Sequence, residues 1–188
     1  MAVSNLKDRS VLAIVTNYGV EQDELVVPVE HLRAAGARVD VAAVSDEPIR
    51  TLVGDKDPGK TVQPTLTLEK ADVTAYDLLL VPGGTLNADS LRQDETAVRA
   101  VRAFASAKRP VAAICHGPWL AVEADLVRGK TLTSYASLRT DIRNAGGAWV
   151  DKPVVSDTAD GWTLITSRTP DDLDDFLREV EAALVPAP

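Results

Sequence analysis

The sequence is short of the residue types on which several classes of protein depend. Its 188 residues include one cysteine, two histidines and only 4% aromatic residues. A single cysteine excludes an internal disulfide and a thiolate-rich metal site. The two histidines and the scattered acids show no metal-ligand spacing, so we expect no bound metal. With so few aromatic residues, the core must consist mainly of valine, leucine, isoleucine and alanine.

Positive charge and long apolar runs are also scarce. The formal net charge is −8, whereas a nucleic-acid-binding protein needs a basic face to displace counterions from phosphates. No stretch approaches the roughly 20 apolar residues of a membrane span, and residues 1–10 lack the apolar run of a signal peptide. Neither a G-x-G-x-x-G nor a Walker-type loop is present. We therefore expect a cytoplasmic protein with no cofactor, no nucleic-acid partner and no membrane partner.

Apolar segments that suit buried strands alternate with segments of helical pattern, as in parallel sheets covered by helices. The pattern predicts strands at 11–16, 38–44, 78–81, 111–114 and 130–134, helices at 24–35, 95–107, 117–124, 138–144 and from 170 onward, and a hairpin of 154–155 with 162–166. Residues 45–74 are less regular, with room for short strands around Thr51 and Val62. We expect an α/β fold, a flavodoxin-like open parallel sheet sandwiched by helices, in one domain spanning residues 1–188.

The strongest chemical signal is Cys115, which lies where the predicted strand 111–114 runs directly into a helix. The arrangement Ala113-x-Cys115-x-Gly117 follows the logic of a nucleophile elbow, in which small residues flank a tight turn that exposes the reactive atom. The start of the following helix would lower the pKa of the thiol. Taken alone, Cys115 could instead be a small buried hydrophobic residue and His116 an ordinary hydrogen-bonding residue.

The string AICHGP at residues 113–118 resembles the nucleophile motif of the ThiJ/PfpI superfamily, and of its PfpI-type intracellular protease branch in particular. Five further segments fit the same family in the same order: 20–25 (VEQDEL), 81–84 (VPGG) with 87–92, 133–135 (TSY), 144–146 with 149–151, and 167–173. Six motifs in this order are not expected by chance. The resemblance covers nearly the whole chain and implies that Cys115 is a nucleophile rather than a packing residue.

Three candidate groups follow predicted strands and should meet at one edge of the sheet, because ligands of open α/β sheets bind at the carboxyl ends of the strands. These groups are Glu21, the pair Gly83-Gly84, and Cys115. The resemblance implies that Glu21 is the family glutamate whose protonated carboxyl donates a hydrogen bond to the sulfur, with a raised pKa. Without the resemblance, Glu21 would be one of three acids in an exposed loop. We interpret Glu24 as the acid of the helix start.

By the same resemblance, the backbone N–H groups of Gly84 and His116 form an oxyanion hole, which requires a close approach without a β-carbon. PfpI-type proteases use a glutamate from a neighbouring subunit to orient the histidine, and Asp89 is the residue at that place here. Asp89 is one methylene shorter and could equally be a helix cap. A shared site of this kind predicts a homodimer or a larger closed oligomer.

Three functions remain open on the sequence. The first is a stress-related cysteine hydrolase of the protease or amidase type, acting on a peptide or amide through Cys115 and His116. The second is a glyoxalase III- or deglycase-like activity on methylglyoxal, a small aldehyde, or on its adducts, with Glu21 as the proton shuttle. The third is a redox-sensing stress protein in which Cys115 is oxidised.

Overall fold

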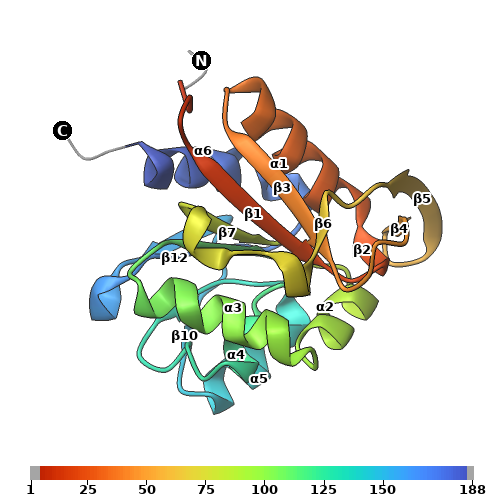
Figure 1. Cartoon of the computed structure of the whole chain (residues 1–188). Coiled ribbons are helices and arrows are strands. Elements are labelled where there is room, and N and C mark those ends of the chain that lie inside the picture. Colours follow the sequence, from red (N-terminus) through yellow and green to blue (C-terminus); the bar gives the residue numbers. More distant parts are fainter. Residues whose placement is uncertain (1–4, 186–188) are drawn as a thin grey trace.

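A central sheet of seven strands, with the order β11-β12-β8-β7-β1-β3-β6, organises the computed structural model (Figure 1). All neighbouring strands are parallel except β11 and β12. The structure describes residues 5–185, so both ends of the predicted domain, including residues 1–4 of the segment assessed for a signal peptide, lie outside it. The strands are β1 (Ser10–Val15), β3 (Arg38–Ala43), β6 (Leu66–Thr67), β7 (Leu78–Val81), β8 (Val111–Ile114), β11 (Val154–Asp157) and β12 (Leu164–Ser167).

Two small sheets lie beside the central one. One contains β2 (Tyr18–Glu21), β4 (Ile49–Val53) and β5 (Asp57–Val62), and the other pairs β9 (Thr131–Leu132) with β10 (Ala148–Trp149). The α-helices are α1 (Gln22–Ala34), α2 (Thr85–Leu91), α3 (Glu95–Ser106), α4 (Trp119–Glu123), α5 (Arg139–Asn144) and α6 (Leu173–Leu184). Over residues 5–185, no helix combines the length and apolar composition that a membrane crossing requires.

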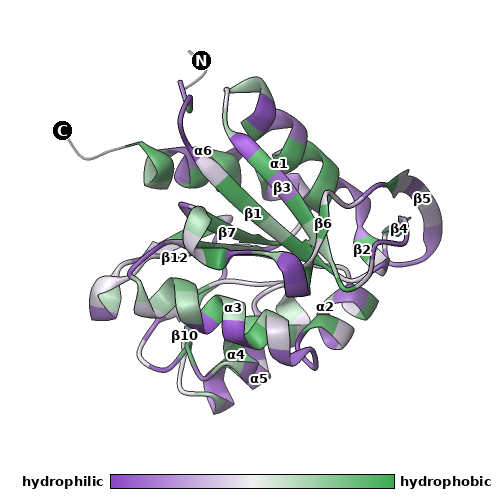
Figure 2. Cartoon of the chain, in the orientation of Figure 1, coloured by the Kyte–Doolittle hydropathy of each residue, from purple (hydrophilic) through white to green (hydrophobic). Residues whose placement is uncertain are grey.

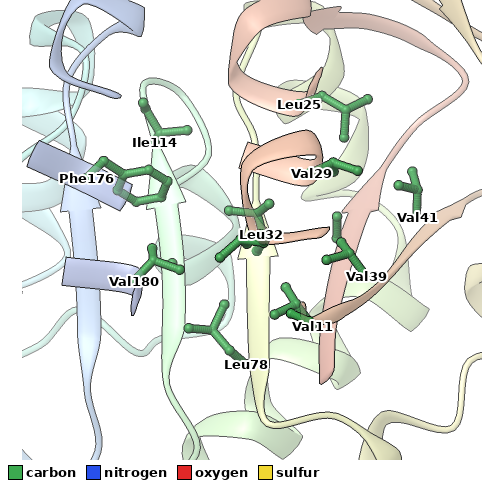
Figure 3. Close-up of a cluster of buried hydrophobic side chains, with 14 of the residues drawn as sticks. Val11, Leu25, Val29, Leu32, Val39, Val41, Leu78, Ile114, Phe176 and Val180 are labelled. Atoms are coloured by element: carbon green, nitrogen blue, oxygen red, sulfur yellow. The ribbon is translucent and has the colours of Figure 1, made fainter. Parts of the chain in front are cut away.

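Helices cover both faces of the central sheet, because alternate side chains of each strand point to opposite sides. In β1, Val11 and Ala13 pack in the cluster that contains α1 and α6, whereas Leu12 and Ile14 pack in the cluster that contains α3, α4 and α5. Figure 3 shows the first cluster, in which Leu32 of α1 and Val180 of α6 lie over the strands. The hydrophobic colouring of Figure 2 follows this arrangement, with apolar strands between amphipathic helices.

The structure confirms the predicted fold class and most of the predicted elements. The strands at 78–81 and 111–114 have the predicted bounds, and the hairpin of β11 with β12 is present. The strands β2, β6 and β10 and the helix α2 were not predicted. Strand β2 lies in the segment 17–23, which the sequence analysis leaves as a loop, because its pairing with β4 is a long-range contact. Helix α2 follows directly after Gly84 and is only seven residues long, too short for a clear helical period.

Lys130, which directly precedes β9, is fully buried and connects this strand to the loop before β12. Lys130 Nζ donates to the carbonyl oxygens of Ala159 and, at 2.8 Å, of Trp162. It also forms an ion pair with Asp157 at 3.3 Å, and its ammonium group lies 4.3 Å from the centre of the Trp162 ring. A buried charge is tolerated only when it is paired in this way.

Replacing Lys130 with methionine should destabilise the fold by about 2–4 kcal/mol, because two carbonyl groups and a carboxylate lose their buried partner. Arg128→Met is the matched control, since Arg128 pairs with Asp125 on the surface and such pairs contribute less than about 1 kcal/mol. Urea unfolding of both variants measures the difference. Equal effects would show that the buried ammonium group has no special role.

Candidate functional site

Cys115 follows β8 in a backbone conformation that is rare for a residue with a side chain, with φ = 62°. Three backbone hydrogen bonds hold this turn. Cys115 N–H donates to Ser167 O of β12 at 3.0 Å, Tyr135 N–H donates to Cys115 O at 2.9 Å, and Gly117 N–H closes the turn on Ile114 O at 2.8 Å. The strained elbow predicted from the sequence is therefore present. Only 6% of the residue is exposed.

His116 lies directly against the cysteine. Its Nδ1 is 3.2 Å from Cys115 Sγ, within hydrogen-bond reach. On the other side of the ring, Nε2 is 3.3 Å from Thr85 Oγ1 and 3.2 Å from Ser137 Oγ. The ring also stacks on Tyr135, with 4.6 Å between centroids. Burial lowers the pKa of His116 below its usual 6.5, while the charge of Asp55 opposes this shift, so the imidazole can serve as a base near neutral pH.

The acid beside the sulfur is Glu24. Its side chain is fully buried, and Oε2 accepts a hydrogen bond from Gly83 N–H at 2.8 Å. The carboxyl group also interacts with the Cys115 thiol. Burial raises the pKa of Glu24 well above its ordinary value. Among residues 5–185, Oε1 has no conventional hydrogen-bond donor opposite it, which favours a protonated carboxyl group over a carboxylate.

The predicted contact of Glu21 with the sulfur is therefore corrected, because Glu24 occupies that place. Glu21 ends β2 and precedes α1, and its Oε2 accepts a hydrogen bond from Asp55 N–H at 3.2 Å. Burial raises the pKa of Glu21 as well, although the N–H groups of Gly54 and Asp55 act against the shift. Helix α1 begins at Gln22, so Glu24 lies in its first turn and faces inward.

Because Gly83 and Gly84 have no side chains, the backbone of this segment can lie close to the Cys115 sulfur. A β-carbon on Gly83 would lie 2.6 Å from Glu24 Oε2, and one on Gly84 would lie 2.2 Å from Gly19 O. Gly84 also has φ = 79°, which favours glycine. The backbone N–H groups of Gly84 and His116 both act to lower the pKa of the Cys115 thiol. These are the two donors that the sequence analysis assigns to an oxyanion hole, a role that stays a prediction.

The pKa of the thiol differs from the expectation drawn from the elbow. The backbone donors do lower it, as predicted, but burial and the neighbouring Glu24 outweigh them and raise the pKa of Cys115. The helix after the elbow is also only five residues long, which weakens its dipole. The resting site is therefore best described as a thiol beside an imidazole base.

Asp89 lies within α2 rather than at a helix cap, and its Oδ1 accepts hydrogen bonds from Arg92 Nε and Nη2 at 3.0 and 2.8 Å. Its predicted role across a subunit interface stays a prediction. Three residues near His116 Nε2 were not predicted from the sequence: Thr85 and Ser137, which face this nitrogen, and Asp55, which accepts a hydrogen bond from the Thr85 hydroxyl group. Within the described part of the chain, no cluster of three or more His, Cys, Asp or Glu residues is arranged to hold a metal ion.

Comparison with known proteins matches residues 9–183 to the DJ-1/PfpI family. General stress protein 18 of Bacillus subtilis is 37% identical over 92% of this chain and 96% of its own length. Protein/nucleic acid deglycase 2 of Escherichia coli is also 37% identical, over 89% of this chain and 94% of its own length. YraA of Bacillus subtilis, described as a candidate cysteine protease, is 36% identical over 89% of this chain and 94% of its own.

A solved structure gives the same result. The crystal structure of Drosophila melanogaster DJ-1beta superposes with a TM-score of 0.82 and 29% identity, over 94% of this chain and 90% of that one. Its fold and the family match agree with the resemblance drawn from the six motifs. The chain therefore belongs to the DJ-1/PfpI family.

Proposed function

We propose that this chain is a cysteine-dependent hydrolase in which Cys115 attacks a carbonyl carbon and His116 acts as the general base. The observation that carries the proposal is the 3.2 Å contact between Cys115 Sγ and His116 Nδ1 on a strained elbow. A nucleophile within hydrogen-bond reach of a base, with the base in turn held by a third group, is the arrangement that covalent catalysis requires.

In the proposed reaction, Sγ forms a bond to the acyl carbon of an amide while the carbonyl electron pair moves to oxygen. The thiol proton passes to His116 Nδ1. The N–H groups of Gly84 and His116 lie beside the sulfur and would stabilise the oxyanion. Collapse of the intermediate breaks the C–N bond, and the imidazolium protonates the leaving amine. Water then hydrolyses the thioester, releasing an acid and restoring the thiol.

The neutral carboxyl of Glu24 supports this chemistry without adding a second negative charge beside the sulfur. Two adjacent anions in a buried site would repel each other strongly. A protonated carboxyl group can instead donate a hydrogen bond to the sulfur as its charge develops. Because Glu24 Oε2 accepts the hydrogen bond from Gly83 N–H, the carboxyl proton is expected on Oε1.

A deglycase- or glyoxalase-like activity is the second candidate, and two observations favour it. Cys115 is only 6% exposed, which suits a small carbonyl compound better than a folded polypeptide. The Glu24 carboxyl interacts with the thiol, so it could move a proton to or from a carbon or oxygen bound to the sulfur. The name of the Escherichia coli relative points in the same direction.

Turnover assays with purified variants separate the two candidates. The substrates are methylglyoxal, a methylglyoxal-treated amine and an amide reporter. Cys115→Ser should abolish activity on the true substrate, and His116→Gln should lower kcat/KM about 10²–10⁴-fold, the usual contribution of a general base. His31→Gln is the matched control, because this second histidine lies in α1 and pairs with Glu181. Full turnover by Cys115→Ser would refute both candidates.

The pH dependence of kcat/KM should report the neutral form of His116. Because burial lowers the pKa of His116 below 6.5, the base is unprotonated at pH 7, and activity should fall only at more acidic pH as the imidazole gains a proton. A profile from pH 5 to 8 measures the position of this limb. An acid limb centred above pH 6.5 would contradict a base with a lowered pKa.

Stability should reveal the protonation state of Glu24. Below about pH 4.5 the carboxyl is protonated in both folded and unfolded chains. As the pH rises, the unfolded chain releases this proton but the folded chain keeps it, so the free energy of unfolding falls by about 1.4 kcal/mol per pH unit until the buried group ionises. Glu24→Gln removes this loss and should gain stability relative to the wild type between pH 4.5 and 7.

Urea unfolding at several pH values measures the effect, with Glu21→Gln as the matched control. Glu21 accepts a hydrogen bond from Asp55 N–H, so its removal should change the pH dependence less. A Glu24→Gln curve parallel to that of the wild type would indicate an ionised Glu24 and would remove the neutral acid from the proposed mechanism.

A further inference from the structure

An aspartate from a neighbouring hairpin is connected to the far side of the His116 ring. Asp55 Oδ2 accepts a hydrogen bond from Thr85 Oγ1 at 2.6 Å, and its Oδ1 accepts one from Thr85 N–H at 2.8 Å. The same Thr85 Oγ1 lies 3.3 Å from His116 Nε2. The side chains therefore form a continuous row from Asp55 through Thr85 and His116 to the sulfur of Cys115.

The proton positions in this row follow from the chemistry of its members. A carboxylate can only accept hydrogen bonds, so the single hydroxyl proton of Thr85 points to Asp55. Thr85 Oγ1 then has only lone pairs to offer His116, and Nε2 must be the donor. In a neutral imidazole with the proton on Nε2, Nδ1 carries the lone pair. That nitrogen is the one that faces Cys115 Sγ.

The local sequence explains how Asp55 reaches this place. It lies in the turn between β4 and β5, where Lys56 N–H donates to Val53 O. Both central residues of the turn, Gly54 and Asp55, have positive φ, at 64° and 58°. Turns of this type favour glycine followed or preceded by aspartate or asparagine. Asp55 N–H also donates to Glu21 Oε2, which fastens the turn to the segment that precedes α1.

The other groups around His116 are compatible with this arrangement. Ser137 Oγ, 3.2 Å from Nε2, can accept the same proton, and Tyr135 stacks on the ring face. Glu24 interacts with the Cys115 sulfur rather than with the ring, and Glu21 interacts with the backbone of Asp55. Of Glu21, Glu24 and Asp55, it is thus Asp55 whose carboxylate is connected to the imidazole, through the hydroxyl group of Thr85.

We propose that Asp55, acting through the hydroxyl group of Thr85, is the positioning residue that fixes the reactive tautomer of His116 within one chain. This inference rests on the proposed function, because a defined tautomer matters only if His116 is the base. It gives the orienting role to Asp55 and Thr85 instead of Asp89 of a second chain. In the reaction, the proton on Nε2 stays in place while Nδ1 takes the thiol proton, and the resulting imidazolium is stabilised by the Asp55 carboxylate.

Nitrogen-15 NMR of the histidine rings tests the tautomer directly and does not depend on turnover. The chain has two histidines, and His31→Gln assigns their signals. In the wild type we expect the His116 proton on Nε2 at pH 7.5. Thr85→Val, which keeps the shape but removes the acceptor, should shift population toward the Nδ1–H form. A wild-type proton on Nδ1, or an unchanged tautomer in Thr85→Val, would overturn the proposal.

Three further variants separate positioning from a general structural effect. Thr85→Ser keeps the hydroxyl group and should restore the wild-type tautomer. Thr74→Val is the matched control, because Thr74 makes the same hydroxyl contact with Asp72, at 2.7 Å, near the opposite end of β7. It should leave the His116 signals unchanged. If Asp89→Asn shifts the tautomer and Thr85→Val does not, the orienting role belongs to Asp89 and the proposal is overturned.

Kinetics supply the second measurement, with the substrate found above. Thr85→Val should lower kcat about 10- to 100-fold with a smaller change in KM, as expected for a misplaced base. Asparagine tolerates the positive φ of position 55, so Asp55→Asn should fold normally. It should also move the acid limb of kcat/KM to lower pH, because the carboxylate that raises the pKa of His116 is removed. An unmoved limb would overturn the role of Asp55. Activity that persists in Cys115→Ser would instead refute the proposed function and leave the NMR result standing.

Discussion

The interaction of the buried Glu24 carboxyl with the Cys115 thiol constrains the rest of the site. A carboxylate without access to water and with a single N–H donor is costly, so the group keeps its proton. Two nearby features depend on this placement. Residue 83 must be glycine, because a β-carbon there would lie 2.6 Å from Glu24 Oε2 and 2.8 Å from the backbone of Ile114 and His116. Helix α1 must begin at Gln22, because this start turns Glu24 inward.

The elbow is held by parts of the chain that are distant in sequence. A left-handed conformation at a residue such as cysteine costs on the order of 1–3 kcal/mol and persists only where the surroundings enforce it. Here β12 supplies the Ser167 carbonyl that accepts Cys115 N–H, and the loop after β9 supplies the Tyr135 N–H that donates to Cys115 O. The reactive geometry therefore requires β12 to pair with β8 and β9 to be in place, which couples the site to the order of the sheet.

The parts of the site that follow directly from local sequence were predictable. Cys115, His116 and Gly84 all lie within three residues of the end of a buried strand, and the apolar runs of these strands are easily recognised. The choice between Glu21 and Glu24 was not predictable, because it depends on where β2 ends and α1 begins. Strand β2 in turn exists only through its pairing with β4. Asp55 was equally hidden, because it lies in the irregular segment 45–74 and meets Thr85 only after the hairpin of β4 and β5 has folded.

The two acids to which the proposals assign a role differ in environment rather than in chemical type. Glu24 is enclosed and neutral, so it can lie against the sulfur without repelling a developing thiolate. Asp55 is at the surface, where water and two hydrogen bonds from Thr85 support its charge. His116 Nε2 is linked to Asp55 through Thr85, and its Nδ1 faces the sulfur with which Glu24 interacts. As the thiol proton crosses to Nδ1 in the proposed reaction, negative charge develops on the side of the neutral acid and positive charge on the side of the carboxylate. Both charges are thus favoured, and exchanging the two environments would oppose the same proton transfer.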